Sequence, residues 1–99
     1  MQLEISKNNK DLNIKILGPL NTITAKEFLD KVMPELDVSG RAYIDLSQMA
    51  FTSSAGLRAF LTIQNALERE DGMTLIKPVE EVMEIFSETG LDRIFNIVH

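Results

Sequence analysis

The sequence predicts an α/β fold with a mostly parallel sheet, and two observations lead to this prediction. Short apolar segments that suit strands alternate along the chain with longer segments whose apolar residues recur at helical spacing. A strand, a helix and a further strand in succession need a crossover connection, which makes the two strands parallel. We expect four or five strands, an antiparallel strand at one edge, and amphipathic helices packed on the sheet.

The first two strands are predicted to form a hairpin. Residues 3–6 and 12–16 both alternate apolar with polar residues, and a polar turn at Asn8-Asn9 separates them. Gly18-Pro19 then ends the second strand. This hairpin supplies the antiparallel edge of the predicted sheet.

The first helix has the most regular apolar stripe in the chain. Thr24 opens a segment that fits a capping box, although Asn21 or Thr22 also suits the cap position. Pro34 interrupts the helix, so its last turn is expected to bend or to stop early. The apolar residues recur at steps of three and four: Ala25, Phe28, Leu29, Val32, Met33 and Leu36.

A strand at residues 41–46 and a helix from Ser54 onward form the centre of the chain. The strand is largely apolar and follows the breaker pair Ser39-Gly40. On the helix, Arg58 and Thr62 continue at steps of four from Ser54 and predict one exposed polar stripe. The other side is apolar: Leu57, Phe60, Leu61, Ile63 and Leu67.

The last third of the chain is predicted to add a strand, a helix and a short final strand. Residues 73–76 form the strand, Pro78 suits the first turn of the helix, and Gly90 suits its C-terminal cap. Residues 94–98 can form the last strand. Across the fold, six positions are expected to be buried together: Phe28, Val32, Ile44, Leu46, Leu57 and Leu61.

Composition limits the possible functions. The 99 residues, 44% of them hydrophobic, suit one domain over 1–99 with an ordinary core. The absence of cysteine excludes disulfides and thiolate metal sites. A net charge of −5 argues against nucleic acid, because binding to its phosphates needs a basic surface. With no apolar run of membrane-spanning length and no signal peptide, we expect a cytoplasmic protein with no membrane partner. We also expect it to be a monomer or a weak dimer.

The chemistry-bearing residues give no support for catalysis. A serine hydrolase needs a base beside its nucleophile, but the one histidine is the terminal His99 and there is no Gly-x-Ser-x-Gly elbow. The scattered glycines form no phosphate-binding loop. Asp45 lies at a predicted strand end, and the other candidate acids are solvated charges at helix ends: Glu68, Glu70 and Asp71. We therefore expect no enzymatic activity, no cofactor and no metal site.

Ser54 has two interpretations at the start of its helix. Its hydroxyl oxygen can accept a hydrogen bond from a free backbone N–H and cap the helix. The same free N–H groups and the helix dipole also favour a phosphate at this position. Arg58 lies one turn further on, within reach of a phosphate on Ser54. The residues alone leave both interpretations open.

Three segments resemble the STAS domain and, more narrowly, the bacterial anti-sigma factor antagonists. They are Gly18-Pro19-Leu20-Asn21 followed by Thr24-Ala25, then residues 44–47 with residues 51–57, and finally residues 86–91. Their order and spacing match over nearly the whole chain. The resemblance implies an α/β sandwich and a protein-binding role.

The resemblance also implies a mechanism. Such antagonists bind an anti-sigma factor, often a serine kinase, and thereby free a sigma factor. The kinase phosphorylates the serine that corresponds to Ser54, which weakens the complex, and a phosphatase, for which the PP2C type is the candidate, resets the cycle. Ser53 and Asn21 stand where many phosphorylated members carry acids. Ser53 is therefore a rival acceptor, and a docking module without phosphorylation, in a sensory or transporter-associated assembly, is the alternative function.

The partner is expected to cover the loop after the second strand, the Ser53–Ser54 turn and the start of the following helix. Both loops follow strands of one sheet and should emerge at the same edge. A small ligand between these two loops is a third possibility, for which the sequence carries no specific signal. The predicted partner-binding residues are Asn21, Thr22, Thr24, Thr52, Ser53, Ser54, Gly56, Arg58 and Thr62.

Overall fold

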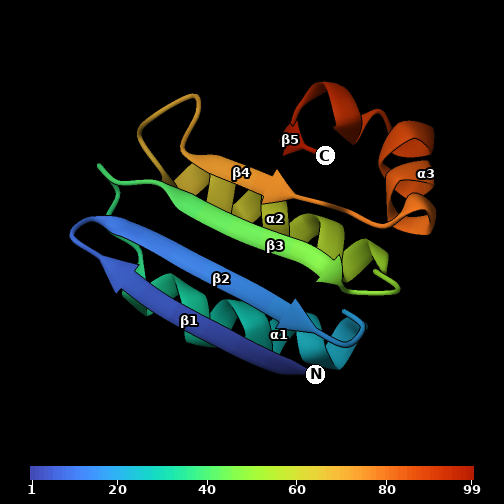
Figure 1. Ribbon diagram of the computed structural model, residues 1–99, viewed down its shortest axis with the longest axis horizontal. Helices are drawn as coiled ribbons and strands as arrows, with labels where there is room; N and C mark the ends of the chain where they lie inside the picture. Colours follow the sequence, from blue (N-terminus) through green and yellow to red (C-terminus); the bar gives the residue numbers. More distant parts are fainter.

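The computed structural model describes residues 1–99 and confirms the predicted α/β fold. Five strands form one sheet in the order β1-β2-β3-β4-β5; β1 runs antiparallel to β2, and the other neighbours are parallel (Figure 1). The strands are β1 (Gln2–Asn8), β2 (Asp11–Leu17), β3 (Ala42–Gln48), β4 (Met73–Ile76) and β5 (Asn96–Val98). The helices are α1 (Thr22–Val32), α2 (Ser54–Ala66) and α3 (Glu80–Thr89), with 3₁₀ turns η1 (Met33–Glu35) and η2 (Leu91–Arg93).

The core lies between the sheet and its helices. Helices α1 and α2 contact each other and cover one face of the sheet, while α3 lies toward one end (Figure 1). Ile14, Ile44 and Leu75 stand side by side on adjacent strands and are fully buried under the helices. Aromatic rings fill the space between the layers in edge-to-face pairs, with centroids from 5.6 to 6.4 Å apart: Phe28, Phe60, Phe86 and Phe95.

The opposite face of the sheet carries no helix. Asp45, which was predicted at a strand end, lies within β3 on this face, beside Lys15 of β2, which in turn pairs with Glu4 of β1. The three side chains line a shallow depression of about 380 Å³. Partial burial raises the pKa of Asp45, but hydrogen bonds from Ser47 and the charges of nearby lysines outweigh this effect and leave the pKa below its ordinary value.

The start of α3 differs from the prediction. The helix begins at Glu80 with Val79 as its N-cap, so Pro78 precedes the helix instead of forming its first turn. The reason lies just upstream, where the Lys77 N–H donates to the Val98 carbonyl at 2.7 Å and holds the chain against β5. The helix can begin only after this tie.

Two further details concern the helices that cover the sheet. Of the three predicted caps for α1, the structure selects Asn21, and the helix stops at Val32 because Pro34 falls in the η1 turn, as predicted.

Five of the six predicted core positions are buried, but Leu61 is only half-buried. It lies on α2 between the buried face and the exposed residue Thr62.

Candidate functional site

The loops that follow β2 and β3 lie against each other at the carboxyl end of the sheet. The Leu20 N–H donates to the Phe51 carbonyl at 3.0 Å, and the Ser53 N–H donates to the Leu20 carbonyl at 2.8 Å. Leu20 and Thr52 form a short parallel bridge that extends the pairing of the two strands. The structure therefore joins the two loops that the sequence analysis placed together.

Gly56 allows α2 to approach these loops. It is buried, and a Cβ atom there would collide with the Thr52 hydroxyl oxygen and lie 3.0 Å from the Leu20 Cβ. Thr52 is only 2% exposed, and its hydroxyl donates to the Ser53 carbonyl at 3.3 Å. Thr52 and Gly56, both among the predicted partner-binding residues, are buried, and they position the loops against α2.

The two adjacent serines have different environments. Ser53 is the N-cap of α2, half-buried, and its Oγ accepts a hydrogen bond from the Gly56 N–H at 3.3 Å. Ser54 is the first residue of the helix and is exposed, and its hydroxyl has no hydrogen-bond partner within the chain. The interpretation of Ser54 as the helix cap is therefore wrong, because Ser53 occupies that position.

The start of α1 forms the neighbouring wall of the site. The Asn21 Oδ1 accepts hydrogen bonds from the N–H groups of Ile23 at 3.0 Å and Thr24 at 2.9 Å, and the Thr24 Oγ1 accepts one from the Asn21 N–H at 2.8 Å. Thr24 thus belongs to a capping box in which Asn21 is the cap. These reciprocal bonds fix the first turn and leave Thr22 exposed beside it.

The polar stripe along α2 is exposed. Ser54, Arg58 and Thr62 all face solvent, and the Thr62 hydroxyl donates to the Arg58 carbonyl at 2.9 Å. None of the three ion pairs in the chain includes Arg58. Its guanidinium is therefore free to bind an anion from outside the fold or from a modified residue nearby.

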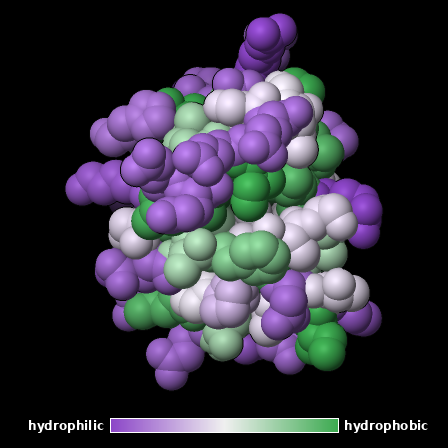
Figure 2. Space-filling model, turned by 90° about the vertical axis from the view of Figure 1, so that its right-hand side faces the viewer, coloured by the Kyte–Doolittle hydropathy of each residue, from purple (hydrophilic) through white to green (hydrophobic).

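The loops after β2 and β3 are nearly uncharged. Arg58 is the only charged residue between Asp45 and Glu68, and no charged residue stands between Lys15 and Lys26. Figure 2 shows the end of the molecule where β2 and β3 finish: strongly hydrophilic side chains gather over its upper part, on the side of α3, whereas pale and green residues cover its centre.

Two exposed apolar side chains at this site were not predicted from the sequence. Ile23 in the first turn of α1 is 72% exposed, and Phe51, in the loop before α2, is 51% exposed. Phe51 is also the only phenylalanine outside the buried aromatic cluster. A signal for Ile23 exists in the sequence, because this residue is out of phase with the apolar stripe of α1 that begins at Ala25. Exposed apolar patches rimmed by polar residues mark protein-binding surfaces, and Ile23 and Phe51 flank the two loops that the Leu20 hydrogen bonds join.

This end of the structure contains no candidate metal site and no carboxyl group with a shifted pKa. It contains no group of three or more His, Cys, Asp or Glu side chains that could hold a metal ion. The carboxyl groups whose pKa is lowered all lie elsewhere: Asp37, Asp45 and Asp71. None of the helices is long and apolar enough to cross a lipid bilayer.

Comparison with known proteins identifies the family. The family model of the STAS domain matches residues 2–99. The chain belongs to the STAS domain family. A comparison with curated proteins finds no significant match.

Solved structures of this STAS domain's neighbours share its fold. An anti-sigma factor antagonist from Mycobacterium paratuberculosis is 20% identical, with a TM-score of 0.86 over 98% of this chain and 84% of that one. The antagonist SpoIIAA in its unphosphorylated form is 16% identical, with a TM-score of 0.80 over 99% and 89% of the two chains. The Bacillus cell fate determinant SpoIIAA in its phosphorylated form is 15% identical, with a TM-score of 0.70 over 99% and 92%.

Proposed function

We propose that this STAS domain is a cytoplasmic anti-sigma factor antagonist that binds an anti-sigma factor kinase and so releases a sigma factor. In this proposal Ser54 is the substrate of the kinase and its phosphorylation weakens the complex. The observation that carries the proposal is the Ser54 hydroxyl, which is exposed and unbonded at the start of α2, beside two loops that carry no charge. Structural neighbours with this fold are anti-sigma factor antagonists, one of them solved in both phosphorylation states.

The proposed modification is a phosphoryl transfer from ATP. A bond forms between the Ser54 Oγ and the γ-phosphorus, the bond from that phosphorus to ADP breaks, and the hydroxyl proton passes to a base of the kinase. The phosphoserine at position 54 carries a charge of about −1.5 to −2 at neutral pH. The free domain accommodates this charge in water at a helix N-terminus, where the dipole and free N–H groups favour an anion.

Interface electrostatics supply the switch. A partner that covers Ile23, Phe51 and Ser54 must exclude water from a surface whose nearby charges are the cations Arg58 and Lys26. A phosphate there must lose its hydration on binding, and burying a charge without full compensation is costly. The complex therefore weakens while the fold stays the same. Removal of the phosphate by a phosphatase, for which the PP2C type is our candidate, restores the binding surface.

Ser53 is the less suitable acceptor. Its Oγ already accepts the Gly56 N–H, and the residue is half-buried under the loop. Modification of Ser53 would disturb the helix cap, whose removal typically costs about 1 kcal/mol. Ser54 can accept a phosphate without loss of any hydrogen bond in the chain.

The alternative function uses the same surface without the switch. Asn21 and Ser53 place no acid beside Ser54, unlike many phosphorylated members that the sequence resembles. In that case the domain docks a partner constitutively within a sensory or transporter-associated assembly, and Ser54 is only a contact residue.

Phosphate transfer decides between these functions. The purified protein is incubated with ATP and a candidate histidine-kinase-like ATPase from the same organism, and phosphopeptides are mapped by mass spectrometry. We expect one phosphate on Ser54, no labelling of Ser54→Ala, and continued labelling of Ser53→Ala and of the control Ser6→Ala. Labelling of Ser54→Ala at the wild-type rate would move the acceptor elsewhere, and binding of the ATPase without any labelling would favour the constitutive module.

A further inference from the structure

A groove between α1 and α2 opens beside the Ser54 turn. Its volume is about 210 Å³, and small side chains, Ala25 from α1 and Ala55 and Ala59 from α2, form part of its lining. Two cationic residues also line it, Lys26 from α1 and Arg58 from α2. Two positive charges from different helices thus converge on one groove in a protein whose net charge is −5.

Both cations are available to a ligand. Arg58 has no ion-pair partner in the chain. Lys26 pairs with Asp30 at 3.0 Å, but these side chains are 77% and 64% exposed, and such surface pairs contribute little to stability. The groove is therefore complementary in charge to an anionic group. Its small alanine side chains leave space for the partner side chain that carries this group.

We propose that Arg58 transmits the phosphorylation state of Ser54 to the partner. With Ser54 unmodified, the Arg58 guanidinium binds a carboxylate side chain of the partner kinase that enters the groove between α1 and α2. With Ser54 phosphorylated, the same guanidinium binds the phosphate. This inference rests on the proposed function, because it assumes that the partner covers the Ser54 end.

The geometry of α2 supports the exchange of ligands. Ser54 and Arg58 are four residues apart on an exposed helix stripe, the spacing at which side chains of opposite charge meet. A guanidinium binds both carboxylate and phosphate through paired N–H donors. The phosphate is tethered to the same helix, so it competes at a high effective concentration against a carboxylate that arrives from another molecule. Its charge then also repels that carboxylate.

The first test needs no partner. The protein phosphorylated at Ser54 is titrated by phosphorus NMR and compared with its Arg58→Gln variant, with Lys10→Gln at the far end of the molecule as the matched control. We expect the second pKa of the phosphate to rise by about 0.2–0.4 in Arg58→Gln, the size of an i, i+4 ion pair. Lys10→Gln should leave it unchanged. Equal titration of wild type and Arg58→Gln would overturn capture of the phosphate by Arg58.

The second test measures affinity for the kinase in a double cycle. In the unmodified protein, Arg58→Gln should weaken binding about tenfold, the effect of losing one charged hydrogen bond, and Lys10→Gln should have no effect. Phosphorylation should then weaken the Arg58→Gln variant less than wild type, because the guanidinium is already absent. Strictly additive effects would overturn the role of Arg58 while leaving the proposed function intact. If the kinase fails to bind the unmodified wild-type protein, the proposed function and this inference both fall.

Discussion

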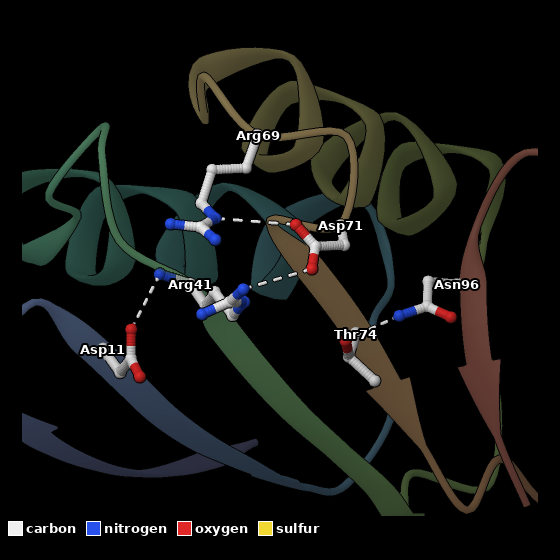
Figure 3. A network of polar contacts seen from close by, with 6 residues as sticks. All are labelled: Asp11, Arg41, Arg69, Asp71, Thr74 and Asn96. Carbon is white, nitrogen blue, oxygen red and sulfur yellow. Dashed lines mark hydrogen bonds and ion pairs between the residues drawn. The ribbon is translucent and has the colours of Figure 1, made fainter.

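The two ends of the sheet use their polar side chains in opposite ways. At the end where β3 and β4 begin, charged side chains bind one another: Arg41 donates to Asp71 at 3.2 Å, and Arg69 donates to the same carboxylate at 3.5 Å (Figure 3). The Asp11 carboxylate accepts the backbone N–H of Arg41 at 3.0 Å. At the end where β2 and β3 finish, Arg58 and the Ser54 hydroxyl have no such partners.

We call the first the structural end and the second, where we propose that a partner binds, the binding end. The first end ties its loops together through charged side chains in addition to backbone hydrogen bonds, and those side chains are therefore occupied. The second end holds its loops through backbone hydrogen bonds around Leu20, through the helix caps at Asn21 and Ser53, and through the close approach of Gly56 to Thr52. Its exposed side chains, Ile23 and Phe51 among them, therefore remain available to another molecule. A surface can be well ordered by backbone hydrogen bonds and helix caps while its other side chains remain without partners.

The largest expected effect compares two phenylalanines. Phe28 is fully buried in the aromatic cluster that supports both ends, so Phe28→Ala should lower the free energy of unfolding by about 3–5 kcal/mol. Phe51→Ala removes the same atoms from the surface and should cost less than about 1 kcal/mol. Chemical denaturation measures both values. We expect Phe51→Ala to weaken kinase binding instead, and a stability loss equal to that of Phe28→Ala would contradict its surface role.

A medium effect is expected from glycine substitutions at the two ends. Gly56→Ala drives a Cβ into Thr52 and Leu20, and overpacking of this kind costs about 1–3 kcal/mol. Gly72→Ala places a Cβ 2.8 Å from the Leu67 Cβ and serves as the matched control at the structural end. Both variants should be less stable to urea. Only Gly56→Ala should also reduce kinase affinity, because it shifts the Ser53–Ser54 turn; equal loss of affinity in both would remove the distinction between the ends.

The smallest expected effect is the loss, at acid pH, of the stability that the Asp71 ion pairs contribute. The hydrogen bond from Arg41, together with the Arg41 and Arg69 charges, lowers the pKa of Asp71 below its ordinary value of 3.8. A lowered pKa means that this contribution to stability is fully present above pH 3.8 and is lost as the pH falls through the lower folded-state value. Asp71→Asn should therefore be slightly less stable than wild type at pH 7, and the difference should shrink below pH 3.8.

Thermal unfolding across this pH range, at low and high salt, measures the Asp71 contribution. High salt should reduce the difference between Asp71→Asn and wild type, since these side chains lie in solvent. Kinase affinity should not change, because the pairs lie at the structural end. A difference that grows toward low pH would contradict the assignment of the lowered pKa to these pairs.

Periodicity was enough to predict the fold. Alternating residues in β2 and the three- and four-residue steps in α1 report directly which face is buried, and the parallel order follows from the crossovers. The start of α3 could not be predicted in this way. It depends on a hydrogen bond from Lys77 to Val98, two residues that are distant in sequence and meet only in the folded sheet.

The candidate site was predictable in position but not in detail. The sequence placed the two serines at a helix start, but either serine satisfies the preference for a cap. Which one caps α2 depends on the Leu20 carbonyl, which fixes the Ser53 backbone from the neighbouring loop. The sequence could not show that Lys26 and Arg58 line the same groove, because this depends on how α1 packs against α2.

The central claim is that phosphorylation of Ser54 switches partner binding at the carboxyl end of the sheet. The most direct measurement is the affinity of the kinase for three samples: the unmodified protein, the protein fully phosphorylated at Ser54, and the latter after phosphatase treatment. We expect the phosphorylated protein to bind at least about tenfold more weakly, with an unchanged fold, and phosphatase treatment to restore the original affinity. Equal affinity of all three samples would contradict the claim.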